Sequence, residues 1–179
     1  REAAAGTDDA APAGERTIVL WEPGFIEGAE GEGGAPVRYP ATTEAASVSA
    51  ELLLQGARTL TFVRSRRAAE TVAMRTQEHL STAGRADVAE RVAPYRAGYL
   101  AEDRRELERR LDNGELLGVA STNALELGID VGGLDAVVMA GFPGTVASFR
   151  QQAGRAGRRG QSSVAVLVAR DEPMDTYLV

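Results

Sequence analysis

Residues 116–145 read LLGVASTNALELGIDVGGLDAVVMAGFPGT. The stretch holds two short apolar runs, Leu116–Ser121 and Leu134–Met139, which are rich in valine, leucine and alanine. Runs of this length and composition predict strands that are buried on both faces, as in a parallel sheet. Each run leads into glycine or hydroxyl residues, which favour a turn. The stretch therefore predicts two neighbouring turns of an α/β fold.

The same alternation of apolar runs and amphipathic segments extends over the rest of the chain. Further strands are expected at 17–21, 58–63, 92–95 and 164–169, and helices at 42–56, 65–83, 101–112 and 146–154. This order predicts an α/β fold with a mainly parallel sheet that helices cover on both faces. Residues 1–15 are predicted to be a disordered linker and 16–179 one domain, with a long flexible loop at about 22–40. In such folds the functional loops follow the carboxyl ends of the strands.

The composition excludes several classes of site. The chain has 179 residues, no cysteine and a single histidine, and all 20 of its basic residues are arginine. A disulfide framework, a thiol nucleophile and a cysteine-ligated metal are therefore excluded, and no metal site is expected. Without lysine and without a GxxxxGK[ST] loop, the chain lacks the usual cradle for nucleotide phosphates.

The charge is unevenly distributed along the chain. The net charge is −6, and residues 1–50 hold nine acidic residues and three arginines, whereas 136–170 hold five arginines and no acid. Positive charge is thus concentrated late in the sequence. The least charged long stretch, 131–149, contains Asp135 and Pro143 and does not read as a membrane span. We expect a cytoplasmic protein without a membrane partner, and the start at Arg1 suggests a piece of a longer chain.

The most specific segment is QQAGRAGRRG at 151–160. Arg155 and Arg158 are three positions apart, so on a helical turn both guanidinium groups can project to one side. Two such groups suit a polyphosphate, which they can neutralise with paired hydrogen bonds. The alternatives are a basic surface loop, or arginines that are neutralised by neighbouring carboxylates. The absence of acids from 136–170 argues against local partners of this kind.

A second segment, STNALELGID at 121–130, follows a predicted strand and turns into a short helix. Its hydroxyl groups and the free N–H groups of the helix would favour an anion such as a backbone phosphate. Gly128 permits a tight turn that would direct Asp130 outward. The alternative is a capping hydroxyl followed by a structural turn.

Two weaker segments also combine arginine with a turn. TFVRSR at 61–66 leads into a helix with Ser65 as its expected N-cap, and YRAGY at 95–99 could hold a sugar–phosphate backbone or stack a base. The tyrosines of YRAGY could equally be packing residues. His79 is predicted to be structural rather than catalytic, and Trp21 to lie in the core.

Four of these segments together resemble superfamily 2 helicases. STNALELGID and QQAGRAGRRG, separated by DAVVMAGFPGT, look like motifs V and VI, TFVRSR looks like motif IV, and YRAGYLAEDRRELERRL resembles the motif IVa segment. Their order is that of the second RecA-like lobe, over roughly residues 16–179. The resemblance implies a RecA-like three-layer sandwich. The amino-acid sequence of these motifs is similar to that of bacterial and fungal DNA-repair helicases related to the human RecQ-four enzyme. This group includes the mitomycin-repair helicases.

The resemblance assigns a role to each motif residue. Arg155 and Arg158 would be arginine fingers on the γ-phosphate of ATP, with Gln151, Gly128 and Asp130 near the nucleotide at the cleft between the lobes. The phosphates of the loaded strand would meet five residues: Ser65, Arg66, Arg96, Gly98 and Thr122. Mg²⁺ would be held by the first lobe, which this sequence lacks together with the cysteine-bearing C-terminal domain of the branch. Gln151 and Gln152 stand where DEAD-box proteins have His-Arg, which argues against that branch.

The resemblance thus implies the second motor lobe of an ATP-dependent DNA helicase, 3′→5′ in direction, acting in DNA repair near the bacterial nucleoid. Its partners would be single-stranded or partly duplex DNA and an N-terminal RecA-like lobe in the same parent chain. The isolated lobe is expected to lack ATPase activity. Two alternatives remain at this point: a non-catalytic RecA-like module that binds nucleic acid or protein, and the lobe of an RNA helicase. A Rossmann-type enzyme is disfavoured because no glycine-rich turn follows the first strand.

Overall fold

A computed structural model describes residues 14–95, 101–125, 134–157 and 161–179. Six parallel strands form one sheet in the order β1-β8-β7-β4-β6-β5. Their bounds are β1 Arg16–Trp21, β4 Thr59–Phe62, β5 Val92–Pro94, β6 Gly118–Ser121, β7 Ala136–Ala140 and β8 Ser163–Val168. The predicted parallel sheet is therefore confirmed.

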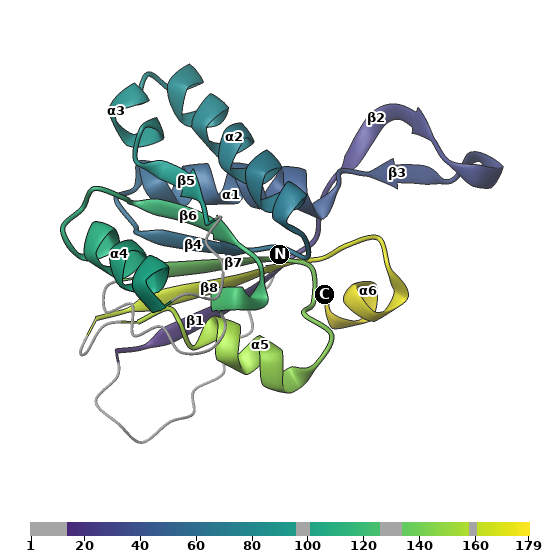
Figure 1. Ribbon diagram of the computed structural model, residues 1–179. Helices are drawn as coiled ribbons and strands as arrows, with labels where there is room; N and C mark the ends of the chain where they lie inside the picture. The colour runs from purple at the N-terminus through teal and green to yellow at the C-terminus, as the bar shows by residue number, and fades with distance from the viewer. Residues whose placement is uncertain (1–13, 96–100, 126–133, 158–160) are drawn as a thin grey trace.

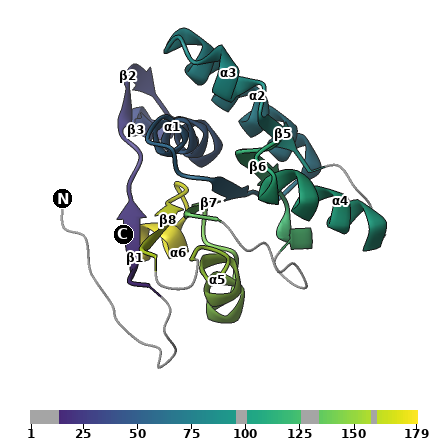
Figure 2. The same cartoon turned by 90° about the vertical axis from the view of Figure 1, so that its left-hand side faces the viewer.

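Helices cover both faces of this sheet (Figures 1 and 2). One face carries α1 Ala41–Leu54, α2 Arg66–Thr82 and α3 Ala86–Ala89, and the other carries α4 Ala101–Asp112, α5 Val146–Ala153 and α6 Pro173–Leu178. The predicted three-layer α/β sandwich is confirmed. Of these helices, the sequence reading missed α3 and α6, which are too short to show a clear period.

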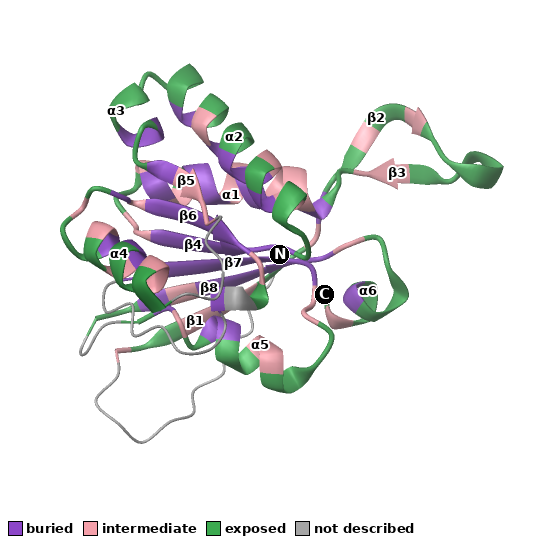
Figure 3. Ribbon diagram, in the orientation of Figure 1, coloured by how far each residue is buried: buried purple, intermediate pink, exposed green. Residues whose placement is uncertain are grey.

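The central strand β7 shows why the sheet needs both helical layers. Its five residues AVVMA are all buried, and successive side chains face opposite sides of a strand. Val137 and Met139 pack in the cluster beneath α4 and α5, whereas Val138 and Ala140 pack beneath α1 and α2. Figure 3 shows the central strands β4, β6, β7 and β8 mostly buried and the outer faces of the helices exposed. The apolar run that predicted this strand is thus the centre of both cores.

The segment predicted as a loop at about 22–40 differs in the structure. It forms two short antiparallel strands, β2 Phe25–Glu30 and β3 Pro36–Arg38, joined through a 3-10 turn η1 at Glu32–Gly34. This hairpin projects from the sandwich (Figure 1). Its base is held by Arg38, whose guanidinium lies 2.6 Å from Glu22 Oε1 and 4.1 Å from the centroid of the Phe25 ring. The many glycines of the segment hid the strands because they interrupt the expected alternation.

Two other expectations concern single side chains. Trp21 was predicted in the core, but it is 40% exposed, and its Nε1 donates a hydrogen bond to Glu44 Oε2 at 3.1 Å. The reason is that β1 is an edge strand and Trp21 is its last residue. His79 is exposed, with Nε2 at 3.1 Å from Ser47 Oγ. Within the described ranges, no helix is long and apolar enough to cross a membrane.

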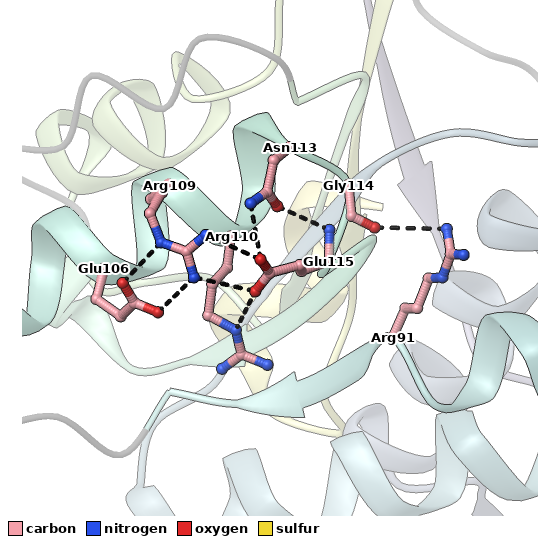
Figure 4. Close-up of polar contacts among 7 residues, drawn as sticks. All are labelled: Arg91, Glu106, Arg109, Arg110, Asn113, Gly114 and Glu115. Carbon is pink, nitrogen blue, oxygen red and sulfur yellow. Dashed lines mark hydrogen bonds and ion pairs between the residues drawn. The ribbon is translucent and has the colours of Figure 1, made fainter.

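The turn after α4 is held by a cluster of charged side chains (Figure 4). Arg109 donates to both carboxylate oxygens of Glu106 and to both of Glu115, at 2.8–3.1 Å. Nearby, Arg91 donates to the carbonyl of Gly114 at 3.4 Å. The Arg109 guanidinium lowers the pKa values of the Glu106 and Glu115 carboxyl groups, and these carboxylates raise the pKa of Arg109. The cluster lies before the amino end of β6, away from the loops at the carboxyl ends of the strands.

Replacing Arg109 with glutamine is expected to raise the pKa values of Glu106 and Glu115 toward those of ordinary glutamates. A carboxylate with a lowered pKa stabilises the fold above its unfolded pKa, and this contribution is lost as the pH falls through the folded pKa. The difference in free energy of unfolding between wild type and variant should therefore be largest near neutral pH and should vanish in acid. Even at neutral pH it should be small, because these side chains are exposed. NMR titration of the glutamate carboxyl carbons measures the change. Arg105→Gln, one turn earlier on the same helix, should leave both values unaltered.

Candidate functional site

Three of the five residues expected to contact phosphates, Ser65, Arg66 and Thr122, follow the carboxyl ends of strands of the sheet. β4 and β6 are neighbours with Phe62 opposite Ser121, so the segments that follow them emerge side by side. The Val63 amide donates to the Ser121 carbonyl at 2.8 Å, and the Tyr95 amide donates to the Ala120 carbonyl at 2.8 Å. The loops after β4, β6 and β5 therefore begin next to one another. Ser65 and Thr122 are brought together in this way, whereas Arg96 and Gly98 lie outside the described residues.

Ser65 is the N-cap of α2, as the sequence predicts. Its Oγ accepts a hydrogen bond from the Ala68 amide at 3.1 Å. A hydroxyl that accepts one bond can still donate its own hydrogen, for example to a phosphate oxygen. Arg66 follows at the first position of the helix and is exposed, and it has no hydrogen bond or ion pair among the residues that the structure describes. The start of this 17-residue helix thus offers a hydroxyl, a cation and free backbone N–H groups to an anion.

Arg64 has a different environment from Arg66. Its two terminal nitrogens donate to the two carboxylate oxygens of Glu172 at 3.2 and 3.4 Å. Glu172 is the N-cap residue of α6. The two arginines that flank Ser65 in the sequence therefore differ in their contacts. Arg64 links the loop after β4 to the start of α6, whereas Arg66 is exposed to solvent.

The segment after β6 is only partly described. Ser121 is fully buried, and its hydroxyl donates to the carbonyl of Thr122 at 3.0 Å. The sequence predicted that this hydroxyl could bind an anion, and that prediction is wrong because the group is buried and already bonded. The chain then forms a short 3-10 helix, η2 Asn123–Leu125, where the sequence predicted a short helix. Thr122 is half-buried at the edge of the sheet. Gly128 and Asp130 lie outside the described residues.

The arginine-rich segment begins on α5, which follows the carboxyl end of β7, and leads back to the amino end of that strand. α5 starts after the carboxyl end of β7, with Thr145 Oγ1 accepting from the Ser148 amide at 3.0 Å. At the far end of the helix, the Gly157 amide donates to the carbonyl of Leu134, which precedes β7. Gln151 is exposed and Arg155 is half-buried in this segment, while Gln152 is buried. Arg158 lies outside the described residues, so its side-by-side placement with Arg155 stays a prediction.

The loop between β7 and α5 is held by a polar cluster that sequence reasoning missed. Asp175 of α6 is buried, and one of its carboxylate oxygens accepts from the amides of Phe142 and Arg170 at 3.0 and 2.9 Å and from Arg170 Nε at 3.2 Å. Arg170 in turn donates to the Phe142 carbonyl at 2.6 Å. Burial raises the pKa of the Asp175 carboxyl, while the Phe142 amide and the charge of Arg64 lower it. Phe142 lies 33 positions before Asp175, and no local sequence pattern links the two.

Gly141 makes room for this cluster. Its φ of +95° lies in the region that side chains disfavour, and a Cβ on it would lie 2.0 Å from Arg170 Nε. Next to it, the ring of Phe142 stacks on that of Phe149 in α5, with the centroids 6.3 Å apart. The loop after β7 is therefore held by α6 on one side and by α5 on the other.

Comparison with known proteins agrees with these features. Residues 44–160 match the model of the helicase conserved C-terminal domain. The chain belongs to this family. It is 42% identical over 172 residues to the ATP-dependent helicase HRQ1 of Saccharomyces cerevisiae, which covers 96% of this chain and 16% of the yeast protein. It is 41% identical to the uncharacterized ATP-dependent helicase YprA of Bacillus subtilis, over 96% of this chain and 22% of that protein.

A solved structure is similar at the level of the fold as well. The DUF1998 helicase MrfA, in a crystal structure with DNA and AMPPNP, superimposes with a TM-score of 0.78 at 40% identity, over 96% of this chain and 23% of that one. This helicase domain therefore spans less than a quarter of the length of each of these relatives. The resemblance of the four motifs to the second RecA-like lobe of superfamily 2 helicases is confirmed.

Proposed function

We propose that this helicase domain is the second motor lobe of an ATP-dependent DNA translocase, 3′→5′ in direction, that acts in DNA repair. The observation that supports it most is the placement of the motifs on one sheet. Ser65 and Thr122 follow the carboxyl ends of β4 and β6, and the segment with Arg155 is bonded to Leu134 just before the amino end of β7, which supports separate sites for the strand and the nucleotide. A rigid sheet between them would let a change at the nucleotide move the contacts to the strand.

At the nucleotide, Arg155 and Arg158 would act as arginine fingers on ATP bound by the first lobe. Two guanidinium groups neutralise the charge that develops on the transferred phosphoryl group, and such fingers contribute about 10³–10⁵ in rate. Gln151, Gly128 and Asp130 would line the same cleft, and Mg²⁺ would be held by acidic residues of the first lobe. The AMPPNP in the structure of MrfA supports a nucleotide in this family. We propose that the isolated domain has no ATPase activity, since it supplies only half of that site.

At the nucleic acid, Ser65, Arg66 and Thr122 would contact successive phosphates, with Arg96 and Gly98 along the same strand. The exposed start of α2 provides donors that read charge and shape rather than sequence. DNA is the proposed substrate because the MrfA structure contains DNA. Phosphate contacts of this kind make binding weaken as salt increases.

The remaining parts of the proposal concern organisation. We propose that residues 16–179 form the lobe, that residues 1–15 are a linker from the first lobe, and that the parent protein works on the bacterial nucleoid. The chain covers less than a quarter of the length of HRQ1, YprA and MrfA, which supports a role as one part of a larger motor.

ATP hydrolysis by the longer protein tests this function. We expect single-stranded DNA to stimulate hydrolysis more than single-stranded RNA of the same length. Arg158→Ala should lower the stimulated rate about 10³-fold or more while DNA binding, measured by fluorescence anisotropy, is retained. The 179-residue chain alone should show no turnover.

The alternatives predict other results. Stimulation by RNA in preference to DNA would indicate an RNA helicase lobe. Absence of ATPase activity, or activity indifferent to Arg158, would indicate a binding module without a motor function.

A further inference from the structure

A single side chain joins the start of the domain to the arginine-rich segment. Nε and Nη2 of Arg16 both donate to the carbonyl oxygen of Ala156, at 3.3 and 3.0 Å. Ala156 follows Arg155 directly and is completely buried. The two partners are 140 positions apart in the sequence. A guanidinium that donates twice to one carbonyl restricts both the position and the orientation of that peptide group.

Residues 14–16 also pack against the residues that follow the arginine-rich segment in the sequence. Arg16 stands opposite Ser163 in the parallel pairing of β1 with β8, and the Ser163 amide donates to the Glu15 carbonyl at 2.9 Å. Gly14 lies so close to Gln161 that a Cβ on it would be 1.9 Å from the Gln161 carbonyl oxygen. Residues 14–16 therefore contact the chain both before and after the undescribed residues 158–160.

The backbone between these contacts has little freedom. Gly157 has φ +126°, a value that other residues rarely adopt, and its amide donates to the Leu134 carbonyl at 3.0 Å. A Cβ on Gly157 would lie 3.7 Å from Arg16 Nη2. The single peptide group between Ala156 and Gly157, one residue beyond Arg155, is thus held through its N–H by Leu134 and through its carbonyl by Arg16.

We infer that Arg16 is a positioning residue for Arg155: it holds the Ala156 carbonyl so that the finger reaches the γ-phosphate. This inference rests on the proposed function. Arg16 itself does not touch the nucleotide. Catalysis depends steeply on such placement, because a shift of about 1 Å can reduce a rate roughly 100-fold. Because Arg16 is exposed to solvent, removing its head group opens no cavity in the core.

The test compares Arg16→Met with Arg91→Met in the longer protein. Arg91 is a matched control because it is also exposed and also donates to a distant backbone carbonyl, that of Gly114. With saturating single-stranded DNA, Arg16→Met should lower kcat roughly 10- to 100-fold and leave KM for ATP and the affinity for DNA unchanged. Arg91→Met should leave kcat unchanged. If Arg16→Met does not fold, Arg16→Lys, which keeps one donor nitrogen in place of two, replaces it and should show a smaller loss of kcat.

A double-mutant cycle identifies the route of the effect. In an Arg155→Ala background, Arg16→Met should reduce kcat by a clearly smaller factor than in wild type, since the finger that it positions is gone. The same factor in both backgrounds, a raised KM for ATP, or a kcat equal to that of Arg91→Met would overturn the inference. If Arg155→Ala alone leaves hydrolysis intact, the proposed function fails, whatever Arg16 does.

Discussion

Replacing Arg155 with lysine is expected to lower DNA-stimulated ATP hydrolysis by the longer protein about 10³-fold, although the positive charge is kept. The reason is geometric. A guanidinium presents a planar fork that can bind two phosphate oxygens at once, whereas an ammonium group is a point charge on a flexible stem. As the proposed finger, Arg155 would act on charge that develops in the transition state, so kcat should fall while KM for ATP changes little.

Arg150→Lys is the matched control for this substitution. Arg150 is exposed on α5, one turn before the end of the helix, and it lies in the same acid-poor stretch as Arg155. Its replacement should change the rate less than about threefold, as expected of an exposed residue without a special contact. Steady-state kinetics on the two variants, with DNA affinity measured in parallel, makes the comparison. Equal rates for both variants would show that Arg155 is not a finger.

Replacing Asp175 with alanine is expected to destabilise the domain by about 3 kcal/mol, a large fraction of the roughly 5–15 kcal/mol of a typical domain. The carboxylate is buried and accepts from the amides of Phe142 and Arg170 and from Arg170 Nε. Removing it leaves these donors without their acceptor next to a guanidinium whose side chain is only 14% exposed. Urea unfolding of the 179-residue chain measures the loss as a lower midpoint at unchanged slope.

Asp171→Ala and Asp175→Asn complete this experiment. Asp171 is an exposed acid just before the same helix, so its loss should stay within about 0.5 kcal/mol. The asparagine keeps one oxygen acceptor, and its effect should fall between the other two. If Asp175→Ala unfolds at the same urea concentration as Asp171→Ala, the polar cluster does not hold α6 and the loop after β7 together.

The elements of the main fold could be predicted from the sequence wherever they carry a local pattern. The apolar runs that form β4, β6, β7 and β8 indicated buried strands, and Ser65 with the apolar period after it indicated the start of α2. Prediction failed where that pattern is short or broken. The glycine-rich hairpin of β2 and β3 was taken for a loop, and α3 and α6 were not anticipated.

For the candidate site, the sequence identified motif residues but not their supports. The motifs identify Ser65, Thr122 and Arg155. In the structure, Ser65 and Thr122 follow the carboxyl ends of neighbouring strands, whereas the segment with Arg155 leads to the amino end of β7. Ser121 was expected to offer a hydroxyl to an anion, yet it is buried and bonded to the Thr122 carbonyl. Burial depends on the strand order, which a single stretch of sequence does not contain.

The sequence by itself determined the α/β class, the bounds of most strands and the motifs that mark a helicase lobe, because these depend on residues that are close along the chain. Only the tertiary structure decided that Arg16 holds the Ala156 carbonyl and that Asp175 holds the loop after β7. In both cases a charged side chain meets backbone groups of a distant segment. Such a contact is set by the strand order β1-β8-β7, which brings the start of the domain beside the segment that follows α5. Every residue has a backbone carbonyl, and every residue except proline has a backbone N–H group. The sequence around such a group therefore does not indicate which distant side chain will bond to it.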